Sequence, residues 1–293
     1  MSKSSPPFKV LTVMQDIIDG VSLDCPDRLA TIRIPELKIT SSDVFTVFNH
    51  ARPLGISPGY DQTGRLVALS IADKENCRIV EFARPPGGRQ GNRQSPTPPK
   101  SIVDGRKSLQ DSVLCRPAGD VYAFDMANIA MSLYSDVSLR IARAVDIQSA
   151  FPPKGREPPN REPLHSIESC VGEEPDPVHK IKINVKNVES LFLQPVYNPE
   201  EDPHTVVDLA VRAWVSQFLA GYGNGAEVFD KVERINTEMM ETRVRLFFYS
   251  YCSTMSTCVN HSRKSILWLN WPPTLSNSNK RSQPMPRINS LNP

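Results

Sequence analysis

The chain has 293 residues, enough for one large domain or two small ones, and 39% of them are hydrophobic, as a globular core requires. No apolar run approaches the roughly 18 residues that a membrane-spanning helix needs, so we expect no membrane partner. The net charge of +2 conceals five basic and no acidic side chains in residues 253–293. The remainder is slightly acidic, so its net charge gives no support for nucleic-acid binding.

The six cysteines are scattered without a C-x-x-C pair, and the five histidines share no metal-ligand spacing with them. The N-terminus lacks the apolar core and the cleavage site of a signal peptide. We therefore expect an intracellular protein, cytoplasmic or nuclear. We expect no disulfide framework and no metal site built from these residues.

The first 39 residues are interpreted as an N-terminal extension, which includes a strand at Leu29–Ile34 where β-branched residues alternate. A domain over residues 40–252 follows. It opens with a predicted helix from about Ser42 to His50, because Ser42 and Asp43 are good N-cap residues and Val44, Val47 and Phe48 share one helical face.

Residues 54–82 predict three strands joined by two short turns. The strands are Leu54–Ile56, Arg65–Ala72 and Cys77–Phe82. The middle strand is apolar on both faces, as expected at the centre of a sheet that helices cover. Because turns of only a few residues can join antiparallel strands but not parallel ones, this segment predicts an antiparallel meander.

A Pro-, Gly- and Arg-rich insertion follows at residues 84–100, and it has no means of burying a core. We expect it to be disordered. Basic side chains lie on it or just after it: Arg84, Arg89, Arg93, Lys100, Arg106 and Lys107. We call these six residues the basic arm. Such an arm can neutralise phosphates without reading sequence, so RNA or DNA is a candidate partner. The alternative is a solvated insertion without a partner.

The segment from Asp120 to Phe151 predicts a strand at Val121–Phe124, a helix that starts after Asp125, and a strand at Leu139–Ile147. A strand, a helix and a strand in this space imply a crossover and hence a parallel pair. Further helices are expected within residues 107–116, 164–172, 208–222 and 238–251. Residues 253–293 lack any period and are expected to be disordered.

Three blocks in this order resemble a ribonuclease-D-like 3'→5' exonuclease domain of the ribonuclease-H-like superfamily. The blocks are the three strands of residues 54–82, the sequence VYAFDMANIAMSLY followed by AVDIQSAF, and the helix DLAVRAWVSQFLAGY. The resemblance covers about residues 40–250. It implies an α/β fold, namely a mixed sheet of about five strands flanked by helices.

The resemblance also implies where metal-binding carboxylates belong, and this sequence lacks them there. Ser57 and Gly59 stand where the family has Asp and Glu, and Leu209 and Ala213 stand where it has Tyr and Asp. Two cations about 3.5–4 Å apart need several carboxylates to neutralise them. No catalytic residue and no metal ligand is therefore carried over to this chain.

Three acids remain as weak catalytic candidates. Asp61 lies in the first turn and serves only if the alignment is shifted; Asp125 stands at a strand-to-helix junction and is otherwise a helix N-cap; Asp146 ends a strand and is otherwise structural. The leading hypothesis is a non-catalytic exonuclease-like domain that binds nucleic acid or a protein partner, without a cofactor. One alternative is an active exonuclease that uses Mg²⁺ or Mn²⁺ with displaced carboxylates. Another is a protein-interaction scaffold.

Overall fold

The computed structural model describes residues 18–19, 29–39, 42–48, 51–83, 98–151, 163–172, 182–193, 196–222 and 225–240. All of them belong to the first of two units into which the chain divides, Met1–Thr242. Most of the Pro-rich insertion, most of the helix expected at 238–251 and all of residues 253–293 lie outside the described residues, so the expectations for them stay predictions.

A six-stranded mixed sheet forms the centre of the described part, with the strand order β2-β5-β4-β3-β6-β7. Its strands are β2 (Ala30–Pro35), β3 (Leu54–Tyr60), β4 (Leu66–Ala72), β5 (Asn76–Glu81), β6 (Val121–Ala123) and β7 (Ala144–Asp146). A separate antiparallel pair consists of β1 (Ile18–Asp19) and β8 (Lys182–Ile183).

The pairing confirms the predicted meander, because β3, β4 and β5 are antiparallel neighbours. It also confirms the crossover, since β6 is parallel to both β3 and β7. The sheet has six strands rather than about five because β2 pairs in parallel with β5. The predicted domain start at residue 40 therefore falls after a strand that belongs to the sheet.

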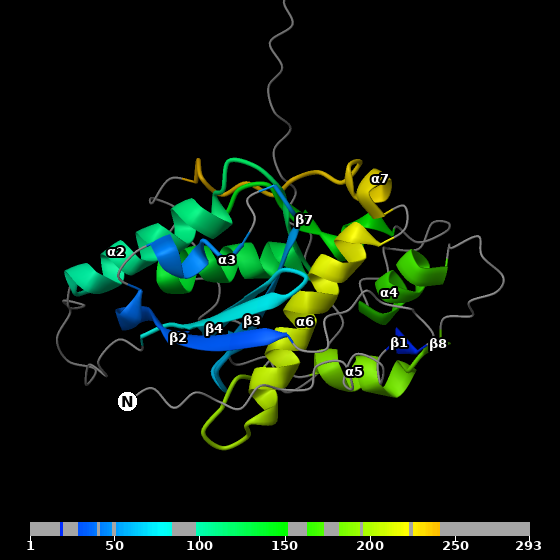
Figure 1. Cartoon of the computed structure of the whole chain (residues 1–293), viewed down its shortest axis with the longest axis horizontal. Helices are drawn as coiled ribbons and strands as arrows, with labels where there is room; N and C mark the ends of the chain where they lie inside the picture. Colours follow the sequence, from blue (N-terminus) through cyan, green and yellow to red (C-terminus); the bar gives the residue numbers. More distant parts are fainter. Residues whose placement is uncertain are drawn as a thin grey trace, which may run out of the picture. The chain divides into compact units, whose positions relative to one another are not determined.

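Helices cover both faces of this sheet, as Figure 1 shows. On one face lie α4 (Pro163–Gly172), α5 (Val185–Leu193), α6 (His204–Gly221) and α7 (Gly225–Phe229). On the other lie α2 (Lys100–Leu109), which continues as a π-helical turn (Gln110–Leu114), and α3 (Met126–Val137). Three 3₁₀ turns complete the set: η1 (Glu36–Lys38), η2 (Ser42–Phe45) and η4 (Ile147–Ala150).

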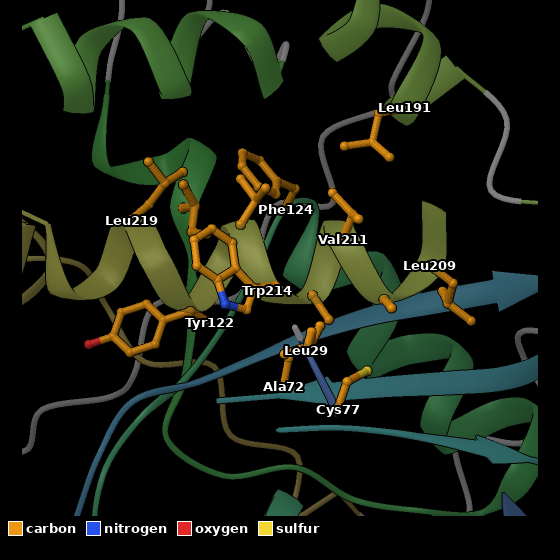
Figure 2. Packing of buried hydrophobic residues seen from close by; sticks show 14 of the residues in the cluster. Leu29, Ala72, Cys77, Tyr122, Phe124, Leu191, Leu209, Val211, Trp214 and Leu219 are labelled. Atoms are coloured by element: carbon orange, nitrogen blue, oxygen red, sulfur yellow. The ribbon is translucent and has the colours of Figure 1, made fainter. Parts of the chain in front are cut away.

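Each face has its own hydrophobic core, because successive residues of a strand point to opposite sides. On the α6 side, Trp214 packs above Ala72 and Cys77 of the sheet, and Leu191 of α5 lies next to Val211 (Figure 2). The indole N–H of Trp214 donates to the carbonyl of Lys74 at 3.1 Å, so this large ring is buried with its polar group satisfied. The core on the other face joins β3, β4 and β6 to α2 and α3.

Three local expectations differ from the structure, and one helix was not expected. The helix predicted at 42–50 is one 3₁₀ turn, since the hydroxyl and the N–H of Thr46 both bond the carbonyl of Asp43 and close a turn there. The strand predicted at 139–147 is reduced to β7, because Ser138 and Arg143 have φ angles of 59° and 53°. The helix predicted at 107–116 starts at Lys100, and α5 was not predicted.

In the part of the chain that the structure describes, no helix is long and apolar enough to cross a membrane.

Candidate functional site

The α6-facing side of β3 carries the two positions at which the resemblance implies metal-binding acids. Ser57 is 4% exposed and pairs in register with Ser70 of β4, which is fully buried. The Ser70 hydroxyl lies 3.2 Å from the sulfur of Cys77 on β5. Burial raises the pKa of Cys77 to about 12. This stretch of the sheet is therefore a row of small, neutral, buried groups.

Helix α6 lies directly on β3 at Gly55. A Cβ at this position would overlap the carbonyl oxygen of Ala213 and would lie 2.6 Å from the backbone nitrogen of Gln217. Only glycine allows the helix backbone to approach the strand this closely. Leu209 and Ala213, the two helix positions at which the resemblance implies Tyr and Asp, are both 0% exposed. The helix thus seals the strand with apolar contacts.

Tyr197 packs against Gly59, the second of the two positions on β3. A Cβ on Gly59 would lie 2.8 Å from the Cβ of Tyr197 and 3.2 Å from that of Ala68. The Tyr197 N–H donates to the carbonyl of Tyr60 at 2.7 Å, and Val196 forms a parallel bridge with the same residue. A carboxylate side chain at position 59 would therefore have to displace Tyr197, which its backbone holds in place.

The hydroxyl of Tyr197 is fixed as well. It donates to Oε1 of Glu81 at 2.5 Å, and Arg33 of β2 donates to the same oxygen from Nε (2.8 Å) and Nη2 (2.5 Å). Burial, and then the hydrogen bond to Glu81, raise the pKa of Tyr197, so its phenol stays protonated at neutral pH. The network ties β2, β5 and the segment before α6 together over the end of β3.

A polar rim remains beside this closed surface, at the carboxyl ends of the parallel strands. The hydroxyl of Tyr60 lies 3.3 Å from that of Ser132 on α3. Arg212 of α6 is 4% exposed and donates to the carbonyl of Leu191 at 3.2 Å, and burial lowers its pKa to about 10. Burial raises the pKa of Asp208, one turn earlier. The rim therefore combines the guanidinium of Arg212 with the carboxyl group of Asp208 and the hydroxyl of Tyr60.

The three weak catalytic candidates have structural roles in the turns where they lie. Oδ1 of Asp61 accepts the N–H groups of Thr63 (2.8 Å) and Arg65 (3.1 Å), so it shapes the β3–β4 hairpin. Asp125 lies N-terminal to α3 with φ of 55°, and its carboxylate accepts from the side-chain amide of Asn128 at 2.6 Å.

Asp146 is 3% exposed and caps η4. Its two carboxylate oxygens accept the N–H of Gln148 at 3.3 Å and the hydroxyl of Ser149 at 2.6 Å. Among the described residues, no group of three or more His, Cys, Asp or Glu side chains could hold a metal ion. The three acids lie at or just after the carboxyl ends of β3, β6 and β7, and each forms hydrogen bonds within its own turn.

Three members of the basic arm are visible on α2, whereas Arg84, Arg89 and Arg93 lie outside the described residues. Lys100 and Lys107 are exposed. Arg106 instead forms an ion pair with Glu36, which is 1% exposed, and donates to the carbonyl of Val137 at 2.8 Å. Lys100 and Lys107 are thus accessible to a polyanion, and Arg106 holds α2 to η1.

Comparisons with known proteins were made for sequence and for structure. No family model and no curated protein sequence matches the chain. Among solved structures, the Nibbler EXO domain of Aedes aegypti is 10% identical, with 71% of this chain and 90% of that one covered and a TM-score of 0.44. Trypanosoma brucei RNase D in complex with GMP is 13% identical, with 65% and 56% covered and a TM-score of 0.41.

The catalytic core of RRP6 from Trypanosoma brucei is 15% identical, with 81% of this chain and 59% of that one covered and a TM-score of 0.33. Because all three scores are below 0.5, the assignment of the fold rests on the sheet itself. An antiparallel β3-β4-β5 meander followed by parallel β6 and β7 is the strand order of the ribonuclease-H-like fold. The described sheet therefore has the ribonuclease-H-like arrangement that the sequence blocks implied.

Sequence reasoning missed Tyr197 and Glu81, because their contact depends on a separation of 116 residues. One signal was present in the sequence. Gly55 and Gly59 occur within a single strand, and glycine inside a strand often marks close approach of another backbone or a bulge. The structure has both features, with α6 at Gly55 and a shift of register between Gly59 and Tyr60.

Proposed function

We propose that this chain is a non-catalytic exonuclease-like domain that binds nucleic acid through its basic arm. The observation that carries the first half is the closed packing at all four positions where the resemblance implies metal-binding or catalytic side chains. Ser57 and Gly59 are buried under α6 and Tyr197, and Leu209 and Ala213 are 0% exposed. Neutral side chains in a packed core supply neither the charge nor the space for two cations.

The basic arm supports the second half of the proposal. Lys100 and Lys107 are exposed on the first and third turns of α2, and Arg84, Arg89 and Arg93 precede them in the sequence. Lysine and arginine on an accessible segment bind phosphates by releasing condensed counterions, and this mode requires no cleft. The closed packing over β3 therefore does not prevent single-stranded RNA or DNA from binding along the basic arm.

A nuclease assay tests the loss of catalysis. Purified full-length protein is incubated with labelled single-stranded RNA or DNA in Mg²⁺ or Mn²⁺, and release of mononucleotides is followed. We expect no release above that of a metal-free control, and no calorimetric binding of Mn²⁺. Metal-dependent release that Asp125→Ala abolishes would overturn the proposal and establish an active exonuclease with displaced carboxylates.

A salt titration tests nucleic-acid binding. Affinity for a single strand should fall steeply with salt, and replacing Arg84, Arg89 and Arg93 with Ala should reduce the logarithmic slope by about 2, since each phosphate contact contributes roughly 0.7 for single strands. The matched control removes the same charge from the exposed residues Lys38, Lys186 and Lys231. If the wild-type protein does not bind, or if the control flattens the slope equally, the arm is not the binding site and a protein partner becomes the better reading.

A further inference from the structure

Strand β2 is one edge of the described sheet, and no described strand pairs with its outward side. The N–H of Ala30 donates to the carbonyl of Glu75 at 3.0 Å, next to β5. In a parallel pair, alternate residues direct both backbone groups to the same neighbour. Ala30, Ile32 and Ile34 therefore bond toward β5, whereas Thr31 and Arg33 direct their N–H and C=O groups outward. Among the described residues, these four groups have no hydrogen-bond partner.

The free edge is short and bounded at both ends. Pro35 has no N–H to donate. At the other end, the carbonyl of Leu29 accepts the hydroxyl of Thr31 at 3.3 Å. The backbone groups that can pair with another strand thus belong to two residues, Thr31 and Arg33, which lie symmetrically on either side of Ile32. An antiparallel copy of the same strand matches this edge in length. Thr31 of each copy then lies opposite Arg33 of the other, and the N–H and C=O groups of both residues form hydrogen bonds across the two strands.

The side chains fit the same symmetry. A two-fold axis at Ile32 places the two Ile32 side chains against each other, and Ile32 is 49% exposed. Arg33 faces the neutral Thr31 of the second copy, and its charge is already paired with Glu81 at 2.5 Å. The antiparallel arrangement therefore joins two apolar side chains at its centre and brings no unpaired like charges directly opposite each other.

Apolar residues next to the strand extend the surface. Six large hydrophobic side chains are exposed in the described residues, and four of them belong to β2, to the turns that follow it, or to α2, which packs on those turns. These four are Ile32, Leu37, Val47 and Val103. Exposed apolar side chains on adjacent elements are typical of an interaction surface.

We propose that β2 pairs edge to edge with β2 of a second copy of this chain, which extends the sheet across a two-fold axis at Ile32. A six-residue strand is only about 20 Å long. The contact therefore buries less than the roughly 800 Å² per partner of a stable interface, so the dimer is weak. This inference does not depend on the proposed function.

Sedimentation equilibrium of the full chain into the high-micromolar range tests association. We expect a concentration-dependent dimer that Ile32→Lys abolishes, because two charges would meet at the axis. Met239→Lys is the matched control, since Met239 is 89% exposed and lies outside the surface. A monomer at all concentrations, or a dimer that Ile32→Lys leaves intact, would refute the pairing.

A cross-linking experiment tests the register. In a two-fold pair centred on Ile32, opposite Cβ atoms lie about 4.5–5.5 Å apart, within the range that disulfide formation tolerates after small adjustments. Ile32→Cys should therefore give a reducible dimer, whereas Thr31→Cys, whose counterpart is displaced by two residues, should give no more than the wild-type protein. Equal cross-linking by both variants, or by neither, would exclude this register.

Discussion

Gly59 stands where the resemblance implies an acid, and it also lies at a tightly packed position of the domain. Its neighbours at the Cβ position are Tyr197 and Ala68, at 2.8 and 3.2 Å. Both are Cβ atoms, so neither can move aside by a side-chain rotation. The packing of this domain therefore requires glycine at position 59, in addition to the fact that glycine offers no metal ligand.

We predict that Gly59→Ala destabilises the domain by about 1–3 kcal/mol, the usual cost of overpacking. Urea unfolding followed by circular dichroism measures the change. In a Tyr197→Gly background, which removes the Cβ that lies 2.8 Å away, the clash is relieved, so the cost of Gly59→Ala should shrink, and the difference is the coupling energy of the pair. Gly221→Ala on α6 is the control, because a Cβ there meets nothing within 4 Å. Equal costs in both backgrounds would contradict the predicted contact.

The buried tyrosines predict how stability depends on alkaline pH. Burial raises the pKa of Tyr122 to about 12, and it also raises the pKa of Tyr60 and Tyr197. An unfolded phenol ionises near its ordinary pKa of about 10. The folded form therefore binds more protons above that pH, and this contribution to stability is complete below about pH 10 and lost as the pH rises toward 12.

Urea midpoints measured from pH 8 to 12 check this prediction. They should fall above about pH 10, and Tyr122→Phe should make the fall shallower because it removes one ionisable group whose pKa is raised on folding. Absorbance at alkaline pH in the native state should show tyrosines that ionise late. A midpoint that rises over this range would have the wrong sign and would contradict the burial of these phenols.

Among the elements, those with strong periodicity could be predicted from the sequence. The meander β3-β4-β5, the β6–α3–β7 crossover and α6 each have a local pattern that the structure confirms. The elements that could not be predicted depend on distant partners. Strand β2 was expected as a strand, but its place in the sheet follows from pairing with β5 over 46 residues of sequence.

The candidate site shows the same limit. The neutral residues Ser57, Gly59, Leu209 and Ala213 could be recognised in the sequence, since each replaces a side chain that the family pattern implies. What covers them could not, because Tyr197 comes from a connection with no regular pattern, and its hydroxyl partner Glu81 is on another strand. The sequence therefore indicated which acids are missing from the site, and it gave no indication that Tyr197 occupies the space beside Gly59.

At helix α2, two adjacent basic residues have different surroundings and separate a structural role from a binding role. Arg106 bridges to Glu36 and to the carbonyl of Val137, whereas Lys107 is exposed. We predict that Arg106→Ala costs about 3 kcal/mol, because it leaves the buried Glu36 carboxylate without its cation. Lys107→Ala should change stability by less than about 0.5 kcal/mol.

Thermal or urea unfolding measures both variants, and nucleic-acid affinity is measured well below the melting temperature of each. Lys107→Ala should weaken binding without loss of stability, and Arg106→Ala should do the reverse. If Arg106→Ala left stability unchanged while it lowered affinity, the ion pair with Glu36 would not anchor α2, and Arg106 would belong to the binding surface after all.

For the molecule as a whole, residues 29–39 are part of the domain, because β2 belongs to its sheet and η1 follows directly. Arg33 of β2 pairs with Glu81 at 2.5 Å, and Glu36 of η1 accepts the N–H of Ala83 at 2.9 Å in addition to its bond from Arg106. Removal of this segment would leave β5 as an edge strand, and its residue Ile79, which is 0% exposed, would lose one flank. An uncovered apolar edge strand promotes aggregation.

We therefore predict different outcomes for two N-terminal truncations. A chain that begins at residue 29 retains β2 and η1, and it should unfold cooperatively with a urea midpoint close to that of the full chain. A chain that begins at residue 40 loses the strand, both ion pairs and the cover of β5, so it should be aggregated or should unfold at a much lower midpoint. Solubility and urea unfolding of the two chains decide the question. Equal midpoints would show that β2 is a dispensable addition, and the domain would then start at residue 40 as its sequence pattern alone indicates.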